Sequence, residues 1–231
     1  MSSGASSGAT ASISEHGKPA DAKLRLGFGP RVRKLHARIG KAHHHAEGMA
    51  FSRALLDGKA TALQLASLLR ALAPAYSFLE ENAPGLAYAL GAEMIPWSDL
   101  ARSKALQHDI SMLTSLPVTP VSVAAGAWQE QLKLLARQAP HRLMAHVYVR
   151  YGGDLSGGQQ LGSQANTILQ SHGFSSLHFW MFDRPVQELK QGLHDGFEQL
   201  KLTDQEETEL LEEADVAFQA TQRLLAELEQ L

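Results

Sequence analysis

The chain has 231 residues, 44% of them hydrophobic, and a formal net charge of −3 at pH 7. This length and hydrophobic content allow one domain with a substantial core, and the charge balance makes nucleic acid an unlikely main partner. The sequence contains no cysteine, which excludes disulfides, thiolate metal sites and thiol catalysis and is typical of an intracellular protein. We find no apolar run near the roughly 20 residues that span a bilayer, so we expect a soluble, cytoplasmic protein, with an organelle stroma as the other option.

The first 23 residues are rich in Ser, Gly and Ala and show no hydrophobic periodicity. This composition predicts a disordered tail. The segment has neither the apolar centre of a secretory signal nor the arginine content of a transit peptide. We therefore expect the folded domain in residues 24–231.

Helical periodicity begins at Pro30 and is expected to continue to the break at Asp57-Gly58. The apolar stripe recurs at three- and four-residue steps: Val32, Leu35, Ile39, Ala42, His43, Ala46 and Ala50. Three histidines follow one another here, and successive helical residues diverge by about 100°, so their imidazoles cannot share one target. Only His43 belongs to the apolar stripe. It is either a hydrogen-bonded core residue or a ligand.

A second helix is predicted from Thr61 to about Asn82, with a bend at Pro74. Tyr76 in this helix is either a packed tyrosine whose hydroxyl finds a nearby partner or a functional group. Further helical segments, broken at prolines, follow in residues 84–138, and we assign no chemistry to them. Two residues in this region are interpreted as packing or surface residues: His108 and Trp128.

Two glycine pairs interrupt the next predicted helix, which begins at Pro140 and is expected to reach about Ser171. Gly152–Gly153 and Gly157–Gly158 place four glycines in seven positions, and each costs roughly 1 kcal/mol relative to alanine inside a helix. A kink, or a ligand pressed against the backbone, would explain them. A phosphate loop does not fit because two glutamines, not a lysine, follow Gly158. A kink that serves only helix packing stays open.

The carboxy-terminal part predicts two further helices. An apolar aromatic segment from Leu177 to Phe182 is interpreted as core, with a lesser chance that it borders a ligand, and Pro185 begins the helix after it. The last helix begins with the capping box Thr203–Glu206. Phe218 lies on its apolar stripe and is interpreted as core. The whole pattern predicts a single all-α domain of about eight helices.

The run from Ala145 to Gly158 resembles the signature of the biliverdin-producing heme oxygenases, a helix ending in Tyr-x-Arg-Tyr-x-Gly-Asp-Leu-Ser-Gly-Gly. The stretch His43-His44-His45-Ala46-Glu47 is similar to the context of their proximal histidine. The resemblance covers about residues 30–230, strongly at these two motifs and loosely between them. It implies a heme-oxygenase-like helical bundle with heme between a proximal helix and a kinked distal helix. Gly152 departs from the family, which usually has a larger apolar residue there, and this could loosen the distal helix or widen the pocket.

The resemblance also implies which residues hold heme. His43 would be the iron ligand, with Glu47 near its imidazole one helical turn later. An ordinary exposed glutamate is the other interpretation of Glu47. Backbone without side chains at Gly153, Gly157 and Gly158 would lie directly against the porphyrin.

Three residues are implied to support the reaction. Asp154 would hold the ordered water through which protons arrive. Arg150 lies four residues earlier on the same helix face, within reach of a charge pair with Asp154. Tyr76 would complete this network. A strong acid–base side chain in contact with heme-bound dioxygen would instead favour peroxidase chemistry.

The propionate contacts implied by the resemblance are less complete. Tyr148 would point toward the heme edge or a propionate, and Lys190 matches a family lysine that approaches a propionate. A solvated surface lysine is an equally good interpretation of Lys190. His194 occupies the position where the family tends to have arginine. This weakens the binding of the heme propionates that the resemblance implies.

The implied reaction opens heme to biliverdin, carbon monoxide and ferrous iron with dioxygen. Electrons would come from an external ferredoxin or reductase, because the sequence has no flavin fingerprint, cysteine cluster or nucleotide loop. We expect a monomer without a membrane anchor. Two alternatives remain: a heme-binding sensor or carrier without turnover, and an enzyme of the same helical superfamily that uses a nonheme metal.

Overall fold

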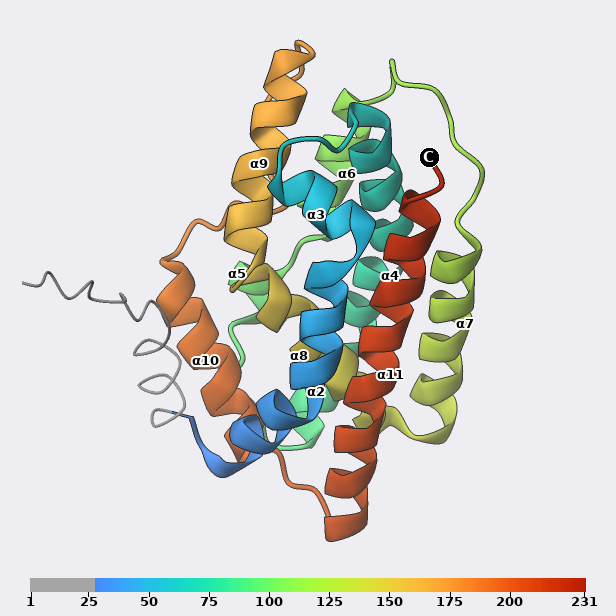
Figure 1. The fold of residues 1–231 in the computed structure, drawn as a ribbon. Helices are drawn as coiled ribbons and strands as arrows, with labels where there is room; N and C mark the ends of the chain where they lie inside the picture. Colours follow the sequence, from blue (N-terminus) through green and yellow to red (C-terminus); the bar gives the residue numbers. More distant parts are fainter. Residues whose placement is uncertain (1–27) are drawn as a thin grey trace, which may run out of the picture.

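The computed structural model describes residues 28–231, so the predicted tail in residues 1–23 lies outside the described residues. The described part is helical throughout, which confirms the predicted all-α single domain (Figure 1). In chain order the helices are α2 (Pro30–Gly48), α3 (Ala50–Leu56), α4 (Ala62–Ala89), α5 (Trp97–Leu100), α6 (Ser103–Met112), α7 (Val123–Gln138), α8 (Leu143–Asp154), α9 (Gly158–Ser171), α10 (Val186–Gln199) and α11 (Asp204–Leu228), with a 3₁₀ turn at Pro140–Arg142.

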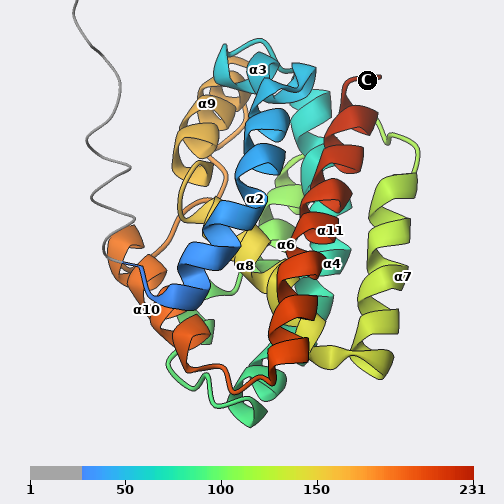
Figure 2. The same cartoon turned by 60° about the horizontal axis from the view of Figure 1, so that its bottom comes forward.

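Helix α8 is the central element of the bundle. It contacts α4, α7, α10 and α11, and its residues from Leu143 to Val149 are buried on all sides. A helix that is apolar around its whole circumference needs such a position. Helices α2 and α11 pack side by side across it, as Figures 1 and 2 both show. The glycine stretch at the end of α8 therefore adjoins the buried core, with Gly158 buried and with Gly153 and Gly157 exposed.

Capping boxes begin two of the long helices. At α4 the Thr61 side chain accepts from the Gln64 amide at 3.1 Å, and the Gln64 side chain accepts from the Thr61 amide at 2.9 Å. At α11, Thr203 and Glu206 form the same reciprocal pair. These bonds satisfy amides that have no partner within the helix. The helix start predicted at Thr203 is confirmed.

Two predicted helix ends were wrong. The first helix ends at Gly48 rather than at Asp57, because Met49 adopts an extended backbone, and α3 then begins at Ala50. Helix α4 continues through Pro84 to Ala89 rather than ending near Asn82. Proline removes one hydrogen bond from a helix, but residues beyond it, such as Ala87, are fully buried. Tertiary packing therefore outweighs the local penalty.

Helix α4 is also the one described helix whose length and apolar composition would allow it to cross a membrane. Of its most apolar 18-residue window, 61% is buried within the fold. Its apolar residues therefore face neighbouring helices, among them α6, α7 and α8. Burial of this kind is what a core helix requires.

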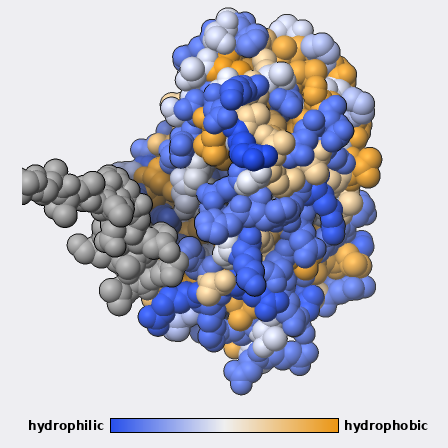
Figure 3. All heavy atoms as spheres, in the orientation of Figure 1, coloured by the Kyte–Doolittle hydropathy of each residue, from blue (hydrophilic) through white to orange (hydrophobic). Residues whose placement is uncertain are grey.

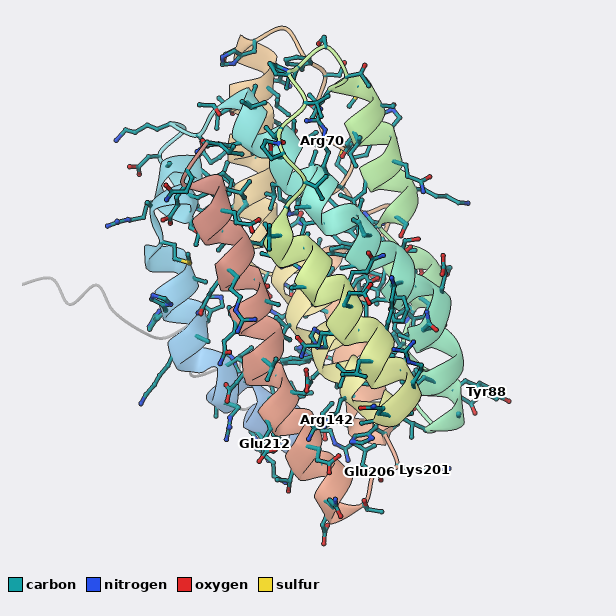
Figure 4. All side chains as sticks on the ribbon, turned by 90° about the vertical axis from the view of Figure 1, so that its right-hand side faces the viewer. Arg70, Tyr88, Arg142, Lys201, Glu206 and Glu212 are labelled. Carbon is teal, nitrogen blue, oxygen red and sulfur yellow. The ribbon has the colours of Figure 1, made fainter. Side chains whose placement is uncertain are left out.

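A buried polar chain fixes the start of α8 against α7 and α11. The Trp128 indole donates to His146 Nδ1 at 3.0 Å, and His146 Nε2 lies 3.1 Å from the Glu213 carboxylate. Because Nδ1 accepts, the imidazole proton is assigned to Nε2, which donates to Glu213. Arg142 adds a bond to the same carboxylate at 3.3 Å, and Figure 4 shows it beside α11 near one end of the bundle. Trp128 is thus a packing residue.

Candidate functional site

A cavity of about 200 Å³ lies between two segments that are far apart in the sequence. His43 contributes to its wall from α2, and Gly153, Gly157 and Gly158 contribute from the junction of α8 and α9. Most of the remaining wall is apolar, with side chains from α3, α4, α9 and α11: Phe51, Leu55, Leu68, Leu72, Leu161, Phe218 and Leu225. The predicted proximal and distal segments therefore face one another across a common space.

The glycine stretch breaks the helix, as its composition predicts. Helix α8 ends at Asp154, residues 155–157 form turns, and α9 begins at Gly158. The Gly157 backbone is right-handed, with φ −63°, so backbone angle does not require glycine there. Space requires glycine only at Gly158, where a Cβ would lie 2.9 Å from Trp180 Cδ1, whereas a Cβ built on Gly153 or Gly157 meets nothing within 4 Å. Bare backbone at the first two positions opens into the cavity.

Of the three consecutive histidines, only His43 reaches the cavity. Its side chain is 50% exposed, and its ring lies 6.0 Å from that of Phe218. Glu47 Oε2 is 3.6 Å from Nδ1 of His43 and 3.3 Å from Nδ1 of His44. The His44 side chain is 89% exposed. The imidazole that borders the cavity is thus the one on the apolar stripe, and its role as iron ligand stays a prediction.

The structure brings Tyr76, Arg150 and Asp154 together at the cavity edge. The Tyr76 hydroxyl donates to Asp154 Oδ2, and Arg150 donates to the Tyr76 oxygen from Nε at 3.2 Å and Nη2 at 3.1 Å. Arg150 Nη2 also lies 3.6 Å from Asp154 Oδ1. Arg150 and Asp154 line the cavity, and Tyr76 is buried behind them.

Burial sets the protonation of this group. It raises the pKa of the Asp154 carboxyl above its usual value, against the charge of Arg150 and the hydrogen bond from Tyr76, which lower it. Burial also raises the pKa of the Tyr76 hydroxyl well above its usual value. Tyr76 therefore keeps its proton and remains the donor to Asp154.

Comparison with known proteins agrees with this geometry. A protein-family model described as heme oxygenase matches residues 32–227. The chain belongs to the heme oxygenase family. It is 28% identical over 204 residues to a heme oxygenase of Guillardia theta, with 85% of each chain covered. Heme is therefore its substrate and cofactor, and the protein is an enzyme.

Solved heme oxygenase structures share the fold. Heme oxygenase-1 from Synechocystis, in complex with heme, superposes with a TM-score of 0.78 and 25% identity, covering 87% of this chain and 93% of that one. Heme oxygenase-2 from Synechocystis, in complex with heme and NO, gives a TM-score of 0.79 and 26% identity, with 87% and 86% covered.

Two residues predicted to hold heme in this heme oxygenase lie away from the cavity wall. Tyr148 is buried, with its ring 5.3 Å from Phe197. It is two positions from Arg150 on α8, so the helical turn directs it toward α10 instead. Lys190 donates from Nζ to Ser156 Oγ at 2.9 Å, in the turn between α8 and α9. Their propionate roles stay predictions.

His194 is buried on the same side of α8. Its ring packs edge-on against Phe28 at 4.8 Å. Burial, followed by the charge of Lys190, lowers its pKa from 6.5 to about 4. The imidazole is therefore neutral at pH 7, and it offers no charge to replace the family arginine.

This shift predicts a pH-dependent stability. Between about pH 4 and 6.5 the unfolded chain binds a proton at His194 that the folded chain does not, so stability falls as pH falls, by about 1.4 kcal/mol per unit. Asp195 opposes the shift, and His36 adds to it. We expect His194→Gln to lose less free energy of unfolding than wild type between pH 7 and 4, in denaturant titrations. The exposed His172→Gln is the control; a His194→Gln profile parallel to wild type would contradict the assignment.

For two cavity residues of this heme oxygenase, the sequence favoured the core over a position beside the ligand. Both of them, Trp180 and Phe218, line the cavity. Each is indeed buried, with 7% and 8% of its surface exposed. Periodicity distinguishes a buried face from a wet one, but it does not distinguish a face packed on protein from a face that borders a cavity.

Three basic residues of α2, Arg31, Lys34 and Arg38, form ion pairs with carboxylates of α11. Glu207 of α11 binds Arg31 at 2.9 Å and Lys34 at 2.6 Å, and Asp215 binds Arg38 at 2.5 Å. Hydrophilic side chains accordingly cover the middle of the face that α2 and α11 form (Figure 3). These ion pairs therefore stabilise the packing of α2 on α11.

The described residues hold one further group of possible metal ligands, His108, Asp109 and His178, outside the cavity. The two imidazoles stack at 4.0 Å with an interplanar angle of 7°, so their in-plane lone pairs run parallel and do not converge on one ion. Asp109 is buried and accepts from the backbone amide of Phe179 at 2.8 Å. The nonheme alternative, which needs ligands from several helices around a cavity, has no such set among residues 28–231.

Proposed function

We propose that this enzyme opens the heme ring to biliverdin, carbon monoxide and ferrous iron, with dioxygen and electrons from an external donor. One observation carries the proposal: a single cavity has the His43 imidazole on one wall and the bare backbone of Gly153 and Gly157 on the other. A flat tetrapyrrole needs an axial ligand and a close, unobstructed face. The cavity offers both.

On the proximal side, His43 is the residue that would bind the iron. Glu47 lies beside its Nδ1 atom, which leaves Nε2 as the ligand atom. A carboxylate next to the other ring nitrogen fixes the tautomer and raises ligand basicity. Heme itself supplies the iron and the ring that is oxidised.

On the distal side, Asp154 is the residue that would hold water for proton delivery. Tyr76 donates a hydrogen bond to the Asp154 carboxylate, and Arg150 forms an ion pair with it. The carboxylate is therefore fixed in place at the cavity edge. A carboxylate held in this way can accept a bond from a water and pass a proton through it. The water, not the side chain, would then reach the oxygens.

Electrons would reach heme from outside the chain. Ferredoxin or a reductase is the proposed donor, because the sequence offers no flavin fingerprint, cysteine cluster or nucleotide loop. We also propose that the protein acts as a monomer.

The deciding experiment adds hemin to the purified protein and supplies ascorbate or reduced ferredoxin in air. We expect a heme complex to form and then to give the absorption spectrum of biliverdin. A heme complex that persists unchanged under both donors would favour the sensor or carrier instead. Absence of any heme complex would reject both functions.

The two adjacent glycines of α8 give a matched test of the bare backbone. Gly153 lines the cavity and Gly152 does not, and a Cβ on either meets nothing within 4 Å. We expect both alanine variants to fold at least as stably as wild type, since alanine gains about 1 kcal/mol in a helix. Only Gly153→Ala should weaken hemin binding, by about tenfold, because overpacking costs about 1–3 kcal/mol. Equal hemin titrations for the two variants would contradict the proposed contact.

A further inference from the structure

The wall of the cavity includes a residue to which the proposed function assigns no role. Trp180 follows α9 and is only 7% exposed. Its indole packs on α9 against two glycines. A Cβ added to Gly158 would lie 3.2 Å from Nε1 of Trp180, and a Cβ added to Gly162 would lie 2.7 Å from the Cβ atom of Trp180. The two glycines therefore make room for the indole, whose nitrogen lies close to Gly158. Both Gly158 and Trp180 border the cavity.

The backbone around Trp180 is held from several sides. The buried carboxylate of Asp109 accepts from the Phe179 amide at 2.8 Å, and the Arg102 guanidinium donates to the Phe179 carbonyl at 3.4 Å. The side-chain amide of Gln159 donates to the Trp180 carbonyl at 3.1 Å. These bonds hold the backbone in place, and the contacts with Gly158 and Gly162 limit the orientation of the indole. The position of the indole is thus a feature of the fold.

The indole N–H of Trp180 has no acceptor within the described residues 28–231, unlike that of Trp128, which donates to His146 at 3.0 Å. Tryptophan is always a donor, and a buried N–H usually finds a partner. Although unpaired, the Trp180 nitrogen is not fully buried. The nitrogen is therefore accessible, and Trp180 belongs to the cavity wall.

We propose that the indole N–H of Trp180 donates a hydrogen bond to dioxygen in the reduced heme complex, or to the water beside it. This inference rests on the proposed function. Bound dioxygen carries negative charge on its oxygens and is a good acceptor, whereas carbon monoxide is a poor one. Trp180 would therefore be a specificity-determining residue that favours the substrate gas over the product gas.

The test compares Trp180→Phe with wild type as reduced heme complexes without an electron donor. Phenylalanine keeps an aromatic ring on the two glycines and removes the N–H. The dissociation rates of dioxygen and carbon monoxide are measured by ligand displacement. We expect dioxygen to leave about three- to tenfold faster, the loss of one hydrogen bond, with carbon monoxide changed less than about twofold. Trp128→Phe, which loses an N–H outside the cavity, should change neither rate.

The two gases separate a hydrogen bond from a steric effect. An equal change for both gases, or no change for either, would overturn the donor role while leaving the proposed function intact. Failure of the wild type to form a heme complex would overturn both. If Trp180→Phe does not fold, benzothienylalanine at position 180 replaces only the N–H with sulfur, and the same rates decide.

Discussion

The Asp154→Ala variant is expected to bind hemin as tightly as wild type but to form biliverdin at least about a hundredfold more slowly. The carboxylate is held by Tyr76 and Arg150 at the edge of the cavity and makes no contribution to the proximal wall. Its loss removes the group that would hold the proton-delivering water. Oxidation should then stop at ferryl heme, as in a peroxidase. Hemin titration gives the affinity, and single-turnover absorption spectra give the product.

Two further variants make this result specific. Asp154→Asn keeps the shape and removes the charge, so it should show the same loss of product with less risk to folding. Asp57→Asn changes an exposed carboxylate outside the cavity and should leave the rate unchanged. Biliverdin formation by Asp154→Ala at the parent rate would show that Asp154 has no part in proton delivery.

The His43→Ala variant is expected to weaken hemin binding by more than about a hundredfold, since loss of even a supporting group around a metal costs 10–100-fold. His44→Ala and His45→Ala are matched controls from the same helix turn. Neither His44 nor His45 lines the cavity, so both variants should bind hemin like wild type. The intensity of the heme absorption band during titration measures all three.

Imidazole in solution gives a second readout for His43. Removing the side chain leaves space beside Ala46 and Phe218 in the cavity wall, so free imidazole should enter and restore the absorption spectrum of the wild-type complex. A His43→Ala spectrum identical to wild type without imidazole would transfer the ligand role to another residue. Loss of the complex in His44→Ala instead would identify that residue.

Local sequence patterns predicted some of this site because the residues concerned act through a single helix. Helical geometry alone placed only one of the three consecutive histidines on the apolar face of α2, and that histidine, His43, borders the cavity. The break at Gly157–Gly158 followed from the poor helix propensity of glycine. The 150–154 pair followed from one turn of helix. The predicted end of α4 was wrong because it depends on tertiary contacts. Ala83 and Ala87 are buried, and their packing extends the helix past Pro84.

The sequence by itself determined an all-helical chain, a helix interrupted at its glycines and an apolar stripe with one histidine, because each depends on backbone preferences within a few residues. Only the tertiary structure decided that Tyr76 reaches Asp154 across 78 positions, that Tyr148 turns toward α10, and that Trp180 lies on Gly158. These contacts depend on how α4, α8, α9 and α10 pack together. How helices pack against one another depends on the side chains along all of their contact surfaces, so the spacing of residues within one helix does not predict it.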